Sequence, residues 1–110
     1  MPDWDSDLAV AAAFAERFDD AVARLDACAL SEEERRMEFQ DLSDCARARA
    51  QVAWLLGDDA VLDEFTSLAP RPLAWEVVRG VSEYVRNNGL KRVVVASVHE
   101  DVVALSLIHI

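Results

Sequence analysis

Two adjacent carboxylates, Asp63 and Glu64, follow directly on a short apolar run at residues 60–62. The run is too short for a helix, so we interpret it as a brief buried strand. Such a strand end places both carboxylates at the carboxyl edge of a sheet, where ligands bind in open α/β folds. In nucleotide hydrolases an aspartate there supports the magnesium shell, and the neighbouring glutamate orients or deprotonates the attacking water. Taken alone, the pair also fits a solvated strand end.

A second apolar run, residues 93–96 (three β-branched valines and an alanine), precedes His99. Continuous runs of this kind are typical of strands buried on both faces, as in parallel sheets. Residues 70–89 between the two runs predict a helix that begins near Pro70 and Pro72 and ends at Asn87-Asn88-Gly89. Strand, helix and strand in this order predict a right-handed crossover between two parallel strands.

The alternative for this region is a hairpin between residues 93–96 and 102–107, with residues 98–101 as its turn. Ser97 and Glu100 also form a capping box that starts a helix at His99. We favour the helix.

The first part of the chain predicts helices. Residues 6–25 have one amphipathic pattern, Ser31 and Glu34 form a capping box before a short helix, and Ser43 opens a second strong helix. Gly57 ends that helix as a natural C-terminal cap. The apolar face of the first helix consists of Leu8, Ala11, Phe14, Ala15, Phe18, Val22 and Leu25.

Four motifs, in the order in which they occur, resemble the ABC-type ATPase family over residues 39–104. The resemblance implies an α/β class: part of a three-layer P-loop NTPase-type fold, with a helix-rich N-terminal part followed by two short parallel strands linked by a crossover helix. Residues 42–49 (Leu-Ser-Asp-Cys-Ala-Arg-Ala-Arg) look like the LSGGQ signature and 50–56 like its helix, 61–64 are similar to the Walker B strand, 65–70 occupy the place of the D-loop, and 93–101 resemble the last core strand and switch histidine.

The resemblance also implies site residues, with ATP and Mg²⁺ as cofactors. Asp63 would support magnesium coordination, Glu64 would be the general base, and His99 would contact the γ-phosphate. Ser43 and the backbone of the residues after it would bind the γ-phosphate of a nucleotide held by a second ABC domain, in a homodimer or heterodimer.

The chain departs from the family pattern at several positions. Asp44 and Cys45 stand where the signature has glycines. Glycine has no side chain and so lets the backbone approach phosphate closely, which these two residues do not. Pro70 replaces the aspartate of the D-loop. No G-x-x-x-x-G-K-[ST] loop is present, and the chain has only 3 glycines. We therefore interpret it as a fragment of an ATP-hydrolysing ABC-type ATPase that is inactive alone.

The expected organisation has three parts: residues 1–41 as a helical lead-in, 42–104 as the C-terminal part of the ABC ATPase domain, and 105–110 as a non-native tail. One reverse translation of the last six residues, CTG TCT CTT ATA CAC ATC, resembles the transposon end used in sequencing libraries. The alternative is a short apolar tail or strand.

Composition narrows the classes of partner. The formal net charge of -10 at pH 7 disfavours nucleic acid and anionic lipid. The acidic N-terminus does not resemble a secretory signal, no apolar run approaches a membrane span, and the two cysteines predict no disulfide framework. We expect a cytoplasmic protein. The competing function is an acidic, mostly helical protein-binding module that docks a partner through the face of Phe14 and Phe18 or the helix of Trp75.

Overall fold

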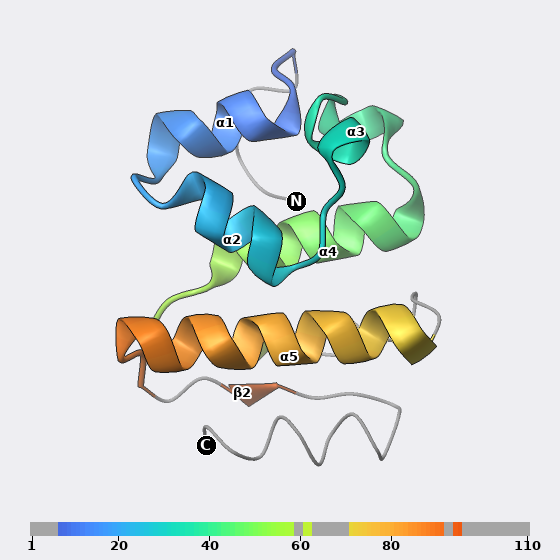
Figure 1. The fold of residues 1–110 in the computed structure, drawn as a ribbon. Coiled ribbons are helices and arrows are strands. Elements are labelled where there is room, and N and C mark those ends of the chain that lie inside the picture. The colour runs from blue at the N-terminus through green and yellow to red at the C-terminus, as the bar shows by residue number, and fades with distance from the viewer. Residues whose placement is uncertain (1–6, 59–60, 63–70, 92–93, 96–110) are drawn as a thin grey trace.

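The computed structural model describes residues 7–58, 61–62, 71–91 and 94–95, and most of these residues are helical. Figure 1 shows the longest helix, α5, between the group formed by α1 to α4 and strand β2. The elements in chain order are α1 (Val10–Arg17), α2 (Ala21–Ala27), α3 (Glu32–Arg35), the 3-10 turn η1 (Phe39–Asp41), α4 (Asp44–Leu55), β1 (Val61–Leu62), α5 (Arg71–Asn88) and β2 (Val94–Val95).

The α/β class expected from the sequence is wrong for the described part of the chain, which is a small helical domain. β1 and β2 pair in parallel, and among the described residues the ladder has two positions, Val61 with Val94 and Leu62 with Val95. Within the described ranges no other strand joins this ladder. A ladder of this length forms no layer for helices to cover, so the partial three-layer P-loop NTPase-type fold is absent from the described residues.

Helix-on-helix packing takes the place of the expected sheet. Helix α5 packs mainly against α2. Gly80 allows this close approach, because a Cβ atom there would lie 2.2 Å from the carbonyl oxygen of Ala27. The buried positions of α5 are Val77, Val78, Val81, Ser82, Tyr84 and Val85. An apolar helix face that is already buried against another helix has no need of a sheet.

The single amphipathic helix predicted for residues 6–25 is two helices. Phe18 leaves the helical conformation at φ −122° and ψ 134°, and α2 begins after Asp20. The extended residue resets the helical phase, so Val22, which the pattern placed on the apolar face, is 65% exposed. The apolar spacing continues across the break, and for that reason the sequence did not reveal it.

The helix starts predicted at Ser31 and Ser43 are confirmed. The Ser31–Glu34 capping box is complete, with hydrogen bonds of 2.9 Å from the Ser31 N–H to Glu34 Oε1 and 3.1 Å from the Glu34 N–H to Ser31 Oγ. Ser43 caps α4 by accepting a 3.1 Å hydrogen bond from the Ala46 N–H. These caps are local interactions, so a few residues of sequence suffice to predict them.

The end of α5 also follows the prediction, whereas the end of α4 does not. Gly89 adopts φ +61° after α5, as a helix-terminating glycine does. Gly57 has no positive φ; instead Leu56 turns the chain at φ −59° and ψ 128°. The carbonyls of Ala53 and Leu56 accept hydrogen bonds of 3.1 Å and 2.8 Å from Arg24 Nη1 of helix α2. A distant side chain therefore replaces the glycine cap.

Three aromatic rings occupy the centre of the helical group. Phe14 packs edge-on against Trp54 with 5.1 Å between ring centroids, and Phe18 lies 5.2 Å from the same ring. Phe14 is completely buried and Phe18 is partly buried against the core. Phe14 therefore serves as internal packing, and its side chain is not open to a docking partner.

The described helices contain no segment long and apolar enough to cross a membrane.

Candidate functional site at the N-terminus of helix α4

The structure brings together one of the two predicted groups of site residues. Ser43, Asp44 and Cys45 form the cap and first turn of α4. Asp63, Glu64 and His99 lie outside the described residues, so their roles remain predictions.

Buried residues before Ser43 fix the start of α4. Phe39 and Leu42 are 5% and 3% exposed, and they anchor the short 3-10 turn to the core. Arg47, one turn into α4, donates a 2.5 Å hydrogen bond back to the carbonyl oxygen of Gln40. The approach to the helix is thereby tied to the helix itself, and Ser43 remains on the surface.

The first turn of α4 has the donors that an anion requires. In any α-helix the first N–H groups have no intrahelical acceptor; the Ser43 hydroxyl satisfies that of Ala46, and those of Asp44 and Cys45 precede it. The dipole of this twelve-residue helix adds partial positive charge at the same end. Donors and dipole together suit a phosphate group.

Asp44 opposes such a ligand. Its side chain is 83% exposed, and its carboxylate lies 3.8 Å from Arg47 Nη1. A carboxylate at the first helical position stabilises the helix, but it also repels a second anion at the same end. Arg47 offsets part of this charge. The site therefore combines a geometry that suits phosphate with an acidic residue that weakens its binding.

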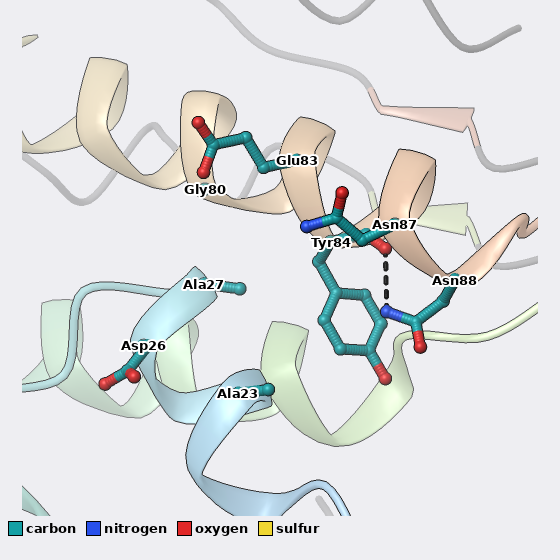
Figure 2. Close-up of a pocket in the computed structure, with 8 residues that line it drawn as sticks. All are labelled: Ala23, Asp26, Ala27, Gly80, Glu83, Tyr84, Asn87 and Asn88. Atoms are coloured by element: carbon teal, nitrogen blue, oxygen red, sulfur yellow. Dashed lines mark hydrogen bonds between the residues drawn. The ribbon is translucent and has the colours of Figure 1, made fainter.

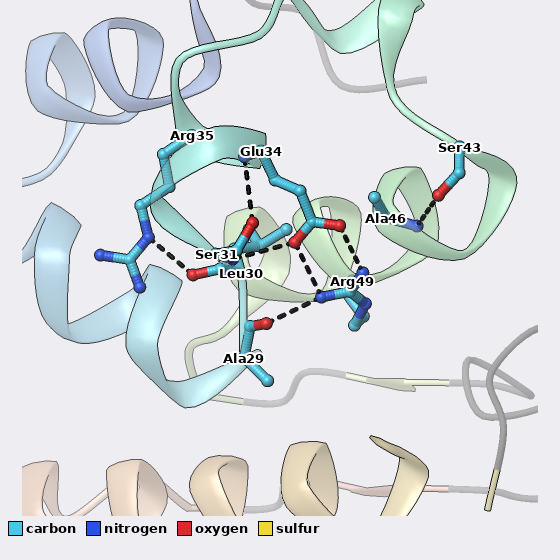
Figure 3. Close-up of polar contacts among 8 residues, drawn as sticks. All are labelled: Ala29, Leu30, Ser31, Glu34, Arg35, Ser43, Ala46 and Arg49. Atoms are coloured by element: carbon cyan, nitrogen blue, oxygen red, sulfur yellow. Dashed lines mark hydrogen bonds and ion pairs between the residues drawn. The ribbon is translucent and has the colours of Figure 1, made fainter.

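A buried ion pair supports α4 one turn farther along the helix (Figure 3). The Arg49 side chain is 6% exposed; its Nη2 lies 2.8 Å from Glu34 Oε2, and its Nη1 donates to the Ala29 carbonyl oxygen at 2.8 Å. Because Glu34 also completes the capping box of α3, Arg49 connects the starts of α3 and α4.

Both members of this ion pair have shifted pKa values. Burial acts to raise the pKa of Glu34, but hydrogen bonds from Arg49 and Ser31 outweigh burial, and the pKa lies below its ordinary value. Burial acts to lower the pKa of Arg49, but hydrogen bonds with Glu34 and Cys45 raise it above its ordinary value. Both groups are therefore held in their charged forms.

A second cluster, which the sequence analysis missed, lies at the other end of α4. Asp20 accepts a 2.9 Å hydrogen bond from Arg24 Nε and another from the Tyr84 hydroxyl of helix α5. Burial acts to raise the pKa of Asp20, but these two hydrogen bonds lower it; burial and Asp20 raise the pKa of Tyr84 to about 12. The i, i+4 spacing of Asp20 and Arg24 was the available sequence signal. Tyr84, which lies 64 residues farther along the chain, could not be recognised from the sequence as a partner of Asp20.

A shallow groove of about 370 Å³ runs between α2 and α5 (Figure 2). Two of its polar side chains have internal partners: Asn88 donates a 2.9 Å hydrogen bond to the Tyr84 carbonyl oxygen, and Asp26 pairs with Arg35 at 2.5 Å. None of the predicted site residues lines the groove. Its lining consists of Ala23, Asp26, Ala27, Gly80, Glu83, Tyr84, Asn87 and Asn88.

The cysteines add no second chemistry. Both are free thiols, and burial raises the pKa of Cys28 to about 12, so Cys28 is not a nucleophile at neutral pH. In the part of the chain that the structure describes, no three or more His, Cys, Asp or Glu side chains are grouped to hold a metal ion.

Comparison with known proteins identifies no relative: no family model matches the chain, and neither a curated protein nor a solved structure is significantly similar to it.

Proposed function

We propose that this chain supplies the signature and Walker B half of an ABC-type ATP site. Its architecture is helical; what it would share with ABC-type ATPases is a set of site residues and their order. In this proposal Asp63 supports Mg²⁺, Glu64 activates water, His99 contacts the γ-phosphate, and the first turn of α4 binds the γ-phosphate of a partner domain's nucleotide. The chain would act in the cytoplasm.

The observation that carries the proposal is the parallel pairing of β1 and β2. The chain continues from Leu62 of β1 directly into Asp63 and Glu64, and from β2 toward His99. Parallel neighbours run in the same direction, so both segments leave the ladder at the same end. The competing hairpin between residues 93–96 and 102–107 uses an antiparallel partner for the second run, and β2 has a parallel one in β1.

The geometry of Ser43 supports the second half of the proposal. The serine of the signature-like segment is the N-cap of a twelve-residue helix, and at this end its hydroxyl and the following N–H groups would face a bound anion. The opposing charge of Asp44 and the absence of a phosphate-binding loop predict weak binding and no turnover by the chain alone.

The competing function, an acidic protein-binding module, loses its strongest surface. It required the face of Phe14 and Phe18 to be open to a partner, and Phe14 is completely buried beneath α2 and α4 residues that include Trp54. Trp75 packs against the same core and is only partly buried.

Nucleotide titration of the ¹⁵N-labelled chain tests the proposal. We expect amide resonances at residues 44–46 to shift with MgATP more than with MgADP, because the γ-phosphate is the group that the helix end would bind. Saturation in the millimolar range is expected, since one helix end replaces a complete site. If MgATP shifted no amide at residues 44–46, the proposal would be wrong.

Two capping serines provide a matched pair of variants. Ser43→Ala and Ser31→Ala each remove an N-cap and should each destabilise the fold by about 1 kcal/mol. Only Ser43→Ala should weaken the response to MgATP. Equal nucleotide responses in the two variants would reject a role for Ser43 beyond capping.

A further inference from the structure

A hydrogen bond links the segment between α4 and β1 to the segment between α5 and β2. Asp58 lies between α4 and β1, and Lys91 lies between α5 and β2. The Asp58 Oδ1 atom accepts a 2.8 Å hydrogen bond from the backbone N–H of Lys91. Both residues are exposed, so the contact is not a by-product of core packing.

The sequence separation of these two residues equals the offset of the ladder. Val61 pairs with Val94 and Leu62 with Val95, an offset of 33 residues in both cases (94 − 61 and 95 − 62). Asp58 and Lys91 are also 33 residues apart. The hydrogen bond therefore joins the positions that lie three residues before the paired residues of each strand, in the same register.

A ladder of two positions needs such a constraint. Isolated two-stranded pairings are marginally stable even when they are longer. A slip by one residue would turn every side chain of a strand to its opposite face. A carboxylate bound to a backbone N–H forms a charge-assisted hydrogen bond, which is stronger than a neutral one and has defined geometry. Asp58 can thus select one register from several of similar energy.

We propose that Asp58 is a positioning residue that sets the register of β1 against β2. The effect of this register on the proposed ATP site rests on the proposed function. Asp63 follows Leu62 directly, and residues 96–99 follow Val95. The register of β1 against β2 therefore fixes where the chain toward Asp63 and Glu64 begins relative to the chain toward His99. Asp58 itself touches neither nucleotide nor metal in this proposal.

Three variants test the role of Asp58 by NMR. Asp58→Ala removes the acceptor, Asp58→Asn keeps an oxygen acceptor without the charge, and Asp19→Ala makes the same charge change at an exposed position in the α1–α2 connection. In Asp58→Ala we expect the Lys91 amide to exchange roughly tenfold faster, and the cross-strand contacts between β1 and β2 to disappear. Asp58→Asn should largely restore both signals, and Asp19→Ala should change neither.

Cross-strand contacts that persist unchanged in Asp58→Ala would overturn the register role. The MgATP titration of the same variants provides the second measurement. A lost ladder with unchanged MgATP-dependent shifts at the amides of residues 61–62 and 94–95 would overturn positioning while the register role stands. A wild-type chain that does not respond to MgATP would reject the proposed function, and the cross-strand contacts would still decide the register role on their own.

Discussion

The two ends of helix α4 are built in opposite ways. At the C-terminal end, Arg24 donates hydrogen bonds to the carbonyl oxygens of Ala53 and Leu56. Arg24 also donates to Asp20, which in turn accepts a hydrogen bond from the Tyr84 hydroxyl. At the N-terminal end, the side-chain cap comes from Ser43, and Ser43 and Asp44 are exposed.

This difference separates a structural end from an end that can bind a ligand. The carbonyls at the C-terminal end are satisfied by the protein, and the guanidinium of Arg24 also lies 3.8 Å from the Phe18 ring centroid. At the N-terminal end, the N–H groups of Asp44 and Cys45 have no acceptor within the helix, and water or an anion can provide one. Rigidity is supplied there indirectly, through Arg49 in the following turns.

Removing Arg24 should have the largest effect on this comparison. Arg24→Met would leave the Asp20 carboxylate and two helix-end carbonyls without their donor, and we expect a loss of about 3 kcal/mol in the free energy of unfolding. Urea denaturation measures this loss. The matched control is Arg36→Met, since Arg36 forms the same i, i+4 pair with Glu32 but is 80% exposed. That change should stay within about 0.5 kcal/mol. Equal losses would show that the cluster at the C-terminal end is not structural.

The second-largest effect is expected in the pH dependence of stability, where the cluster at the C-terminal end of α4 includes Tyr84. The pKa of Tyr84 is raised to about 12, so the neutral hydroxyl is favoured in the folded state. Its contribution is complete below the ordinary value of 10.0 and is lost as the pH rises from there toward about 12. Tyr84→Phe should remove the Tyr84 share of this alkaline loss and leave that of Cys28, whose pKa is also raised to about 12; thermal denaturation between pH 9 and pH 12 (about three pH units) would measure the difference.

The acid range reports on both ends. The pKa values of Glu34 and Asp20 are lowered, so each carboxylate stabilises the fold above its ordinary pKa, and this stability is lost as the pH falls through the lowered value. Glu34→Gln should flatten the acid limb only in part, because Asp20 retains its share, and it should leave the alkaline limb unchanged. An alkaline limb that changed in Glu34→Gln would contradict the separation of the two ends.

Local interactions were predictable from the sequence, and distant ones were not. Ser31, Ser43 and Gly89 act within one helical turn, so their neighbours in sequence are also their partners in space. The break at Phe18 depends on packing against Trp54, which lies 36 residues farther along the chain (54 − 18). The cap of α4 came from Arg24 rather than from Gly57 for the same reason.

The fold class was wrong because two short apolar runs on either side of a helix, together with the family resemblance, were taken to imply a sheet. An apolar, β-branched run indicates that a segment favours the extended conformation, but not how many partners it will have. Here β1 and β2 pair only with each other among the described residues, while α5 finds its partner in α2. Of the candidate site, the helix-capping role of Ser43 was predictable, whereas the supporting Arg49–Glu34 ion pair depends on two helices meeting.

The smallest expected effect concerns Asp44 and has opposite signs in two measurements. Asp44→Asn removes a negative charge from the first turn of α4 and should reduce stability by about 0.5 kcal/mol, because the helix dipole favours an anion there. The same change removes repulsion of a phosphate and should tighten MgATP binding by roughly threefold. Asp41→Asn is the control, since Asp41 is exposed and lies in the preceding 3-10 turn. If both variants tightened binding equally, the gain would reflect only the net charge of the chain, and the N-terminus of α4 would not be the end that binds the nucleotide.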